Sequence, residues 1–386
     1  MKFPWLKSNY DRLLIGLLGL LLCVVLIGVA DFSHINSEQI FDVERGRVIY
    51  VISENLWQDY YIPTLEVGSQ MVEIEVLSGT FAGEQLVIWH QLTRFHNFHL
   101  TDGMAVLVSL APGTTVLTPY DIAVYSPTRG SVLIVVLVIL AVGLLVVGRS
   151  KGFYALVSLV FTFIVIIYFL IHGIVSGGSP VFLAIVSSLL IITFATGMIS
   201  GVSKETLAAV GGAVIGLLAA GLSSFIIGNV TRISGIHLDG VRQVLYHTPL
   251  ATIIGIQDLF FAVVIIATTG AMIDSSISIA SSAFELNAQS KKMSWRKLYQ
   301  SSMQIARSVL GANVNTLILA FAGTSLVTLL LIVLFGFPTL RIINLELVAI
   351  EIILGASATI GMLVGIPATA FFASFLAAPE KRGGRK

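Results

Sequence analysis

Long blocks of hydrophobic residues dominate the chain and predict membrane-spanning helices. Eight blocks are each long enough to cross a hydrocarbon core about 30 Å thick, which needs roughly 20 helical residues. They are residues 13–30, 130–148, 153–175, 179–200, 205–228, 253–282, 308–336 and 345–375. The last three are long, as tilted or protruding helices are. The pattern therefore predicts a polytopic α-helical membrane bundle of eight spans.

One segment, residues 31–129, interrupts these blocks with short runs in which hydrophobic and polar residues alternate. Such runs predict strands, and Gly79 and Gly83 between two of them indicate a turn. The runs are residues 48–53, 71–76, 84–89, 104–109 and 121–125. The segment is too short for a two-sheet sandwich, so we expect a small all-β domain, either a partly closed barrel or a curled sheet.

Composition excludes an ordinary cytosolic enzyme. Of the 386 residues, 56% are hydrophobic and 11% are charged, whereas soluble domains carry about 25% charged residues. The single cysteine, Cys23, excludes a disulfide or a thiolate metal site within one chain. Walker A, GxSxG and HExxH patterns are also absent from the sequence. We therefore predict no enzymatic activity, no cofactor and no metal.

Basic residues are distributed unequally between the two predicted sides of the membrane, although the net charge is only +1. With the N-terminus inside, the cytoplasmic side carries Lys2, Lys7, Arg12, Arg149, Lys151, Lys204, Lys291, Lys292, Arg296, Lys297, Arg307, Lys381, Arg382, Arg385 and Lys386. The outer side carries Arg45, Arg47, Arg94, Arg129, Arg232, Arg242 and Arg341. The positive-inside rule then predicts that both termini are cytoplasmic and that the acidic β domain is extracytoplasmic.

This topology divides the chain into four parts. They are an N-terminal anchor (1–30), the outer β domain (31–129), a seven-helix membrane domain (130–378) and a basic cytoplasmic tail (379–386). Residues 1–30 also resemble a cleavable signal peptide, because Gly28, Val29 and Ala30 precede Asp31. The hydrophobic stretch is longer than the usual signal core of about 7–15 residues, which favours a retained anchor.

Asp274 is the strongest candidate for chemistry inside the membrane, where a charged side chain is costly and usually functional. At helical spacing it shares one face with Ala267, Gly270, Ser278 and Ser281. Small residues let a neighbouring helix approach, and hydroxyls can satisfy a carboxylate or bind a cation. The alternative is a solvated acid at the cytoplasmic end of a shorter helix.

Asn313, Asn315 and Thr316 form a second polar segment, at the start of the seventh span. Their amide and hydroxyl groups need partners in hydrocarbon. No lysine or arginine lies well inside any span, so neutral donors would have to serve Asp274. The segment could form one midplane polar site with Asp274, or it could simply hold two helices together.

Glu351, in the last span, is a further candidate for ion or proton coupling. It lies nearer the predicted outer surface than Asp274 does. A relay acid and a water-exposed vestibule carboxylate are both consistent with that position, and the second is favoured.

Two other groups of polar residues have simpler interpretations. His90, His96 and His99 are expected to be solvated surface residues of the β domain rather than metal ligands. Residues 285–307 are basic and predict an amphipathic connector lying on the anionic inner leaflet. Nucleic-acid binding is the weaker interpretation, since this run is short and tethered to the membrane.

The late spans resemble a known family. The resemblance rests on the segments Gly270-Ala271-Met272-Ile273-Asp274 and Asn313-x-Asn315-Thr316 and on the helix from Glu351 to Pro367. They are similar to YibE/F-type bacterial membrane proteins, which implies the bacterial cytoplasmic membrane. A more distant similarity links the G-x-x-x-D helix to SecD/SecF and resistance–nodulation–division proteins, and it implies a proton-transfer role for Asp274.

The leading hypothesis is a proton- or ion-coupled secondary transporter or exporter whose small-molecule or ion substrate is unknown. Asp274 would alternate its access between the two sides, as midplane sites of secondary transporters do. The alternative is a non-transporting scaffold that presents the β domain to a partner protein. Polar faces on three consecutive late spans favour transport, because a scaffold needs only close-packing glycines. The oligomeric state is left open.

Overall fold

The computed structural model describes residues 4–29, 42–111, 113–238, 240–241, 255–289 and 293–378. The expected tail 379–386 and the residues 31–41, Arg242, Lys291 and Lys292 lie outside these ranges. The chain divides into two compact units, Ser33–Gly143 and a helical unit of Met1–Phe32 with Leu144–Lys386.

The first unit contains one antiparallel sheet of five strands in the order β3-β2-β1-β4-β5. The strands are β1 (Asp42–Gln58), β2 (Glu66–Val76), β3 (Gln85–Leu92), β4 (Ala105–Leu110) and β5 (Ile122–Pro127). The start of β1 pairs with β4 and the remainder with β2. Register shifts between Val48 and Tyr50 and between Val51 and Ser53 mark irregularities that strengthen the twist. The sheet curls until Cα atoms of β3 and β5 approach within 8 Å. This confirms the predicted strands and the curled sheet.

Alternate residues of these strands form the core of the β unit, as the period of two predicts. The buried set includes Val48, Val72, Ile74, Val76, Ile88, Val106, Val108, Ile122 and Val124. A sheet with one buried face needs this strict alternation, so the sequence pattern also fixes the register.

His90 corrects the expectation that all three histidines of this region are solvated. Its side chain is only 5% exposed because it shares the inward register of Ile88 and Leu92 on β3. The Nε2 atom lies 3.0 Å from the carbonyl oxygen of Phe98. Burial lowers the pKa of His90 below its ordinary value, so the buried imidazole is held neutral.

This burial predicts that acid weakens the β unit well before its carboxylates titrate. The unfolded chain binds the proton at the ordinary histidine pKa, so stability is complete above about pH 6.5 and declines as the pH falls below it. Limited proteolysis of the full-length protein should cleave the β unit faster at pH 5 than at pH 7.5. His90→Gln keeps a donor for Phe98 and should remove most of this difference. An unchanged pH response in the variant would contradict the assignment.

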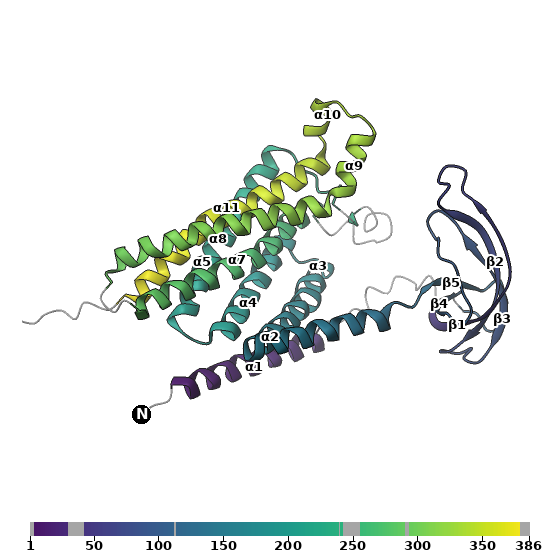
Figure 1. Ribbon diagram of the computed structural model, residues 1–386, viewed down its shortest axis with the longest axis horizontal. Helices are drawn as coiled ribbons and strands as arrows, with labels where there is room; N and C mark the ends of the chain where they lie inside the picture. The colour runs from purple at the N-terminus through teal and green to yellow at the C-terminus, as the bar shows by residue number, and fades with distance from the viewer. Residues whose placement is uncertain are drawn as a thin grey trace, which may run out of the picture. The chain divides into compact units, whose positions relative to one another are not determined.

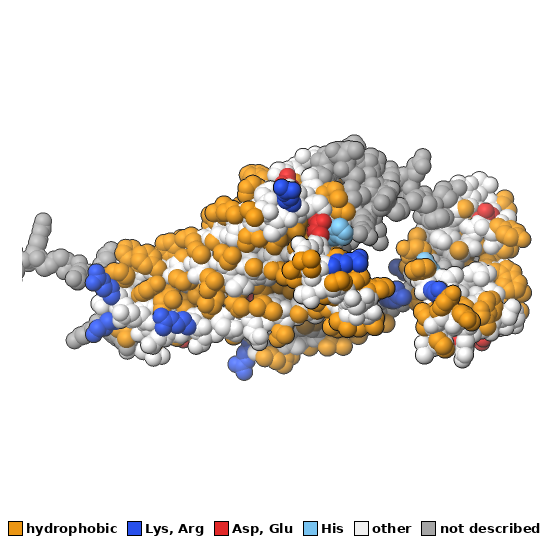
Figure 2. Space-filling model, turned by 90° about the horizontal axis from the view of Figure 1, so that it is seen from above, with side chains coloured by type: hydrophobic (Ala, Val, Ile, Leu, Met, Phe, Trp, Pro, Cys, Tyr) orange, Lys and Arg blue, Asp and Glu red, His pale blue; other side chains and the backbone are white. Residues whose placement is uncertain are grey.

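Among the described residues, the helical unit and the helix that leads into it contain six helical segments long and hydrophobic enough to cross a membrane. They are Gly130–Val175, Pro180–Ser200 (α4), Lys204–Val230 (α5), Ile256–Gln289 (α7), Trp295–Thr324 (α8) and Glu346–Ala377 (α11). Shorter helices are α9 (Leu326–Leu334) and α10 (Thr339–Ile343), and α1 (Pro4–Val29) contains the hydrophobic stretch Ile15–Gly28. The long helices of the unit lie side by side (Figure 1). On the described surface seen in Figure 2, hydrophobic side chains far outnumber charged ones. The protein is therefore a multi-pass membrane protein.

The segment Gly130–Val175 contains two of the expected spans in one helical run of 46 residues. It consists of α2 (Gly130–Ile164), the π-helix η2 (Val165–Ile171) and α3 (His172–Val175). At 1.5 Å per residue, a straight helix of this length would be about 69 Å long, more than twice the hydrocarbon thickness. The helix breaks at Arg149, whose φ is 49°. A Cβ on Gly152 would lie 1.9 Å from the Leu144 carbonyl oxygen, so only glycine allows this tight turn.

The region 285–307, expected as an amphipathic connector, belongs to two helices, and Arg296, Lys297 and Arg307 on it are exposed. Its first residues continue α7 to Gln289, and its last thirteen are the first turns of α8. Leu298, Ser302 and Ala306 recur every four residues and are fully buried. Because this stripe packs into the bundle, α8 runs unbroken from Trp295 instead of turning onto a surface.

Three contacts bring several helix ends together. An Nη2 atom of Arg12 donates to the Ile199 carbonyl oxygen at 3.3 Å, which joins α1 to the end of α4. Asn287 donates through Nδ2 to the Ala377 carbonyl oxygen at 2.7 Å, which joins the ends of α7 and α11. The ring of Trp295, the first residue of α8, lies 6.1 Å from that of Phe371. The final turns of α7 and α11 therefore lie beside the start of α8.

Glycines hold α5 and α11 together at close range. A Cβ on Gly212 would lie 1.9 Å from Thr369 Oγ1, and one on Gly365 would lie 2.8 Å from the Cα of Gly216. A Cβ on Gly361 would lie 2.8 Å from the Gly216 carbonyl oxygen. Small residues four apart allow membrane helices to approach in this way. Gly212 and Gly216 therefore form a close-packing face of α5.

Candidate functional site

Helix α7 is the central element of the helical unit, because it packs against α4, α5, α8 and α11. Three pairs of polar side chains near the middle of α7 connect it to its neighbours. Thr269 Oγ1 donates to Ser188 Oγ on α4 at 2.8 Å, Asn313 Nδ2 on α8 donates to Ser275 Oγ at 2.7 Å, and Thr369 Oγ1 on α11 donates to Ser276 Oγ at 3.3 Å. Interhelical hydrogen bonds of this kind contribute about 0.6 kcal/mol each in membranes. They also fix the rotation of α7 about its axis.

Asp274 lies near the midpoint of the 34-residue helix α7. Its side chain opens into a groove of about 340 Å³ between α4, α7 and the helical run α2–η2. Ser158 and Thr162 from α2 and Gly270 and Thr269 from α7 also line this groove. Among the described residues, no hydrogen bond or ion pair engages the carboxylate. An acid at this position can therefore exchange protons or cations with whatever enters the groove.

The expected site combining Asp274 with the asparagines of α8 is not formed. Asn313 instead donates to Ser275, which is next to Asp274 in sequence but about 100° around the helix. Asp274 faces α2 and α4, whereas Asn313 comes from α8 on another side of α7. The two groups therefore occupy separate places, and the asparagine acts between helices.

The remaining candidates are scattered over three surfaces. Asn315 is exposed, and Thr316 is exposed with its hydroxyl donating to the Ala312 carbonyl oxygen at 3.0 Å. Ser278 is also exposed, one turn beyond Asp274 on α7. Glu351 lines a different groove, between α8, α9 and α11. The structure thus brings only Asp274 and its small neighbour Gly270 together in one groove.

The buried hydroxyls on α7 are the polar groups that sequence reasoning missed. Thr268 and Thr269 precede Ser275 and Ser276 by seven residues, which is two helical turns. All four are buried against the rest of the helical unit. Two hydroxyl pairs at this spacing were the available signal, and they indicate a helix packed on several sides.

The wall of the groove opposite Asp274 has unusual geometry. Ile166 lines the groove and belongs to η2, which is a π-helix seven residues long. Such widened turns are rare and often occur at functional sites. One side of the groove is thus formed in part by a π-helix.

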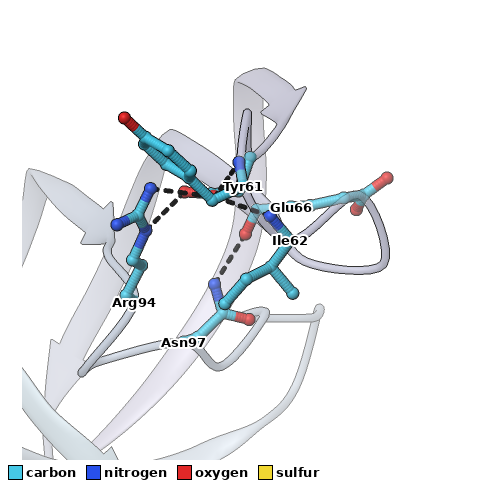
Figure 3. Close-up of polar contacts among 6 residues, drawn as sticks. Tyr61, Ile62, Glu66, Arg94 and Asn97 are labelled. Carbon is cyan, nitrogen blue, oxygen red and sulfur yellow. Dashed lines mark hydrogen bonds and ion pairs between the residues drawn. The ribbon is translucent and has the colours of Figure 1, made fainter. Parts of the chain in front are cut away.

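The β unit has a second notable feature, at the loops that follow β1 and β3. Arg94 forms a two-pronged ion pair with Asp59, at 2.7 and 2.9 Å, while Asp59 also accepts from the amides of Tyr61 and Ile62 (Figure 3). The Arg94 guanidinium holds the pKa of Asp59 below its ordinary value. These contacts fix a loop pair whose Tyr60 and Phe95 side chains are 89% and 96% exposed.

No group of three or more histidine, cysteine, aspartate or glutamate side chains that could hold a metal occurs within the described ranges. His90 is buried against Phe98, and His99 lies 3.2 Å from Glu66. These two histidines therefore have contacts within the β unit itself.

Comparison with protein families identifies the helical part of the chain. The family model described as "YibE/F-like protein" matches residues 136–379, more than half of the chain. The chain belongs to this family. The matched region includes Asp274, Asn313 and Glu351, whereas the five-stranded sheet lies outside it. No curated protein and no solved structure matches the chain. The distant similarity to SecD/SecF and resistance–nodulation–division proteins therefore rests on sequence pattern alone.

Proposed function

We propose that this protein is a proton- or ion-coupled secondary transporter of the bacterial cytoplasmic membrane, with Asp274 as the coupling carboxylate. The observation that carries the proposal is an acid without a described partner at the middle of the central helix. A carboxylate in hydrocarbon costs about 2.5–3.5 kcal/mol even on lenient scales, so a purely structural role would need a compensating partner. Binding a proton or a cation removes that cost.

The groove supplies what a coupling site needs besides the acid. Ser158, Thr162 and Thr269 offer hydroxyl oxygens that can help coordinate a cation or a hydrated proton. The π-helix and the break at Arg149 give the α2–η2 wall two places where it can bend. Movement of this wall against α4 and α7 would alternate the access of Asp274.

Reconstitution into liposomes that contain a pH-sensitive dye tests the proposal. An imposed potential or a gradient of the transported substrate should produce proton movement that protein-free liposomes lack. Sodium and potassium gradients in parallel distinguish a proton from another coupling ion. Absence of ion movement under every gradient would contradict the proposal.

The topology that we propose has eight spans with both termini in the cytoplasm. The break at Arg149 would divide the 46-residue run into two crossings, and α1 would be the first. In a Cys23→Ser background, cysteines at Thr80 and Ser294 should react with an impermeant thiol reagent from opposite sides of the membrane. Thr80 should label in intact cells, and Ser294 only after permeabilisation. Labelling of both positions in intact cells would overturn this topology.

The alternative function is a membrane scaffold that presents the β unit to another protein. The exposed Tyr60 and Phe95 favour it, because exposed aromatic side chains in rigid loops are typical of docking sites. Under this alternative the liposome assay shows no flux, while replacing both aromatic residues by serine abolishes the cellular activity. These two experiments therefore distinguish a transporter from a scaffold.

A further inference from the structure

A second groove lies between α11 and the helices α8 and α9, separate from that of Asp274. Its volume is about 680 Å³, and almost all of its lining is hydrophobic. Leu347, Val348, Ile360 and Ile318 lie toward its ends. On α11 the lining extends from Leu347 to Ile360, which corresponds to a length of about 20 Å. This groove is large enough for a long alkyl chain.

One acidic side chain, Glu351, lines this hydrophobic groove. It is partly buried, and within the described ranges no cation or hydrogen-bond donor engages it. Glu346, one helical turn earlier, is by contrast satisfied by the amides of Ser234 and Gly235 and by the Ser234 hydroxyl. A carboxylate facing a hydrophobic groove needs a positive partner, and the described part of the chain supplies none.

Ser325 provides an independent polar group at the same level. Phe321 of α8 contacts Gly355 of α11, and these helices are antiparallel because Trp295 contacts Phe371. Ser325 follows Phe321 by four residues, and Glu351 precedes Gly355 by four residues. In an antiparallel pair of helices these two positions lie opposite each other. The Ser325 side chain is 9% exposed and lines the groove, yet its Oγ has no hydrogen-bond partner among the described residues.

We propose that this groove binds an amphiphile with a cationic ammonium head and a hydrophobic tail. The positive head would pair with Glu351, a head that carries N–H groups would also donate to Ser325 Oγ, and the tail would lie along Gly355 and Thr359. Glu351 is five residues from the start of α11, about 8 Å along the axis, and most of the α11 residues that line the groove, from Ile352 to Ile360, lie deeper. An amphiphile in a bilayer has its charged head near the surface and its hydrophobic tail deeper. The groove has the same order, with Glu351 near the helix end and the hydrophobic wall beyond it.

The groove is distinct from the proposed coupling site in both residues and location. Asp274 lies between α2, α4 and α7, whereas Glu351 faces α8 and α9. The inference therefore holds whether or not Asp274 carries protons, and a binding measurement tests it without any transport.

The test is equilibrium binding of radiolabelled dodecyltrimethylammonium to the full-length protein in phosphatidylcholine nanodiscs. Dodecanol serves as the neutral probe with the same tail. We expect Glu351→Gln to weaken binding of the cation by about tenfold, which corresponds to loss of one charge pair. Binding of dodecanol should change by less than about twofold. Equal binding of both probes to the wild-type protein, or no effect of Glu351→Gln, would overturn the proposal.

Two further variants make the result specific. Ala356→Phe adds a ring within the groove and should weaken both probes, whereas Asp274→Asn should affect neither. Thermal melting of each variant shows whether it is folded. Nanodiscs with added phosphatidylethanolamine identify the source of the ligand. Competition by this lipid assigns the site to a lipid amine, and lack of competition assigns it to a free lipophilic cation. Unchanged binding in Ala356→Phe would place the probe elsewhere and contradict the groove.

Discussion

Replacing Asp274 by asparagine is expected to reduce ion-coupled flux to the level of protein-free liposomes. Asparagine keeps the size of the side chain and its hydrogen-bonding capacity, but it cannot take up or release a proton. Because no other acid lines the 340 Å³ groove among the described residues, no described neighbour there can substitute. The measurement is dye-reported flux from equal amounts of reconstituted protein.

The matched control is Asp258→Asn, in the first turn of the same helix. It makes the same chemical change about 24 Å away along the axis of α7. We expect Asp258→Asn to keep at least half of the wild-type flux. Full activity of Asp274→Asn, with the protein correctly inserted, would exclude Asp274 as the coupling group.

Replacing Gly365 by leucine is expected to prevent α5 and α11 from packing and to unfold the helical unit. Even a single Cβ at this position would lie 2.3 Å from Met272 Cε and 3.0 Å from the Gly212 carbonyl oxygen. The backbone atom cannot move without separating the two helices. Overpacking a well-packed core lowers the free energy of unfolding by about 1–3 kcal/mol. Leucine is larger than the single Cβ that already lacks room here, so we expect a loss at the upper end of this range. Loss of the monodisperse peak in size-exclusion chromatography and a lowered melting temperature would report the effect.

Gly311→Leu is the control for this substitution. Gly311 also lies in the interior of a long helix, but a Cβ on it would meet nothing within 4 Å. The change in helix propensity is the same, so the difference between the variants measures the contact alone. Similar melting temperatures for the two variants would show that the contact between α5 and α11 is not essential.

The positions of most elements follow from one-dimensional patterns. The expected spans 179–200, 205–228 and 345–375 agree within a few residues with α4, α5 and α11. The expected span 253–282 begins within a few residues of the start of α7. This agreement arises because membrane helices must satisfy every backbone group internally, so hydrophobic length alone specifies them. The expected strands are found for a related reason, since alternation of period two is needed to cover one face of a sheet.

The local pattern could not show which way each polar group faces. Asp274 and Asn313 were expected to meet, because both are polar and lie at comparable depth. Their separation depends on the rotation of α7, which the contacts of Thr269, Ser275 and Ser276 with three different helices set. Hydrophobic residues surround such a helix on every side, so its sequence carries no amphipathic signal for rotation.

The sequence by itself determined that this is a multi-pass membrane protein with a small β domain and an acid at the middle of a late helix. Each of these follows from length, period or residue type. Only the tertiary structure decided that α7 is central, that Asp274 and Glu351 open into separate grooves, and that His90 is buried. These depend on which residues far apart in the chain become neighbours, and that is decided by the packing of whole helices and strands against one another.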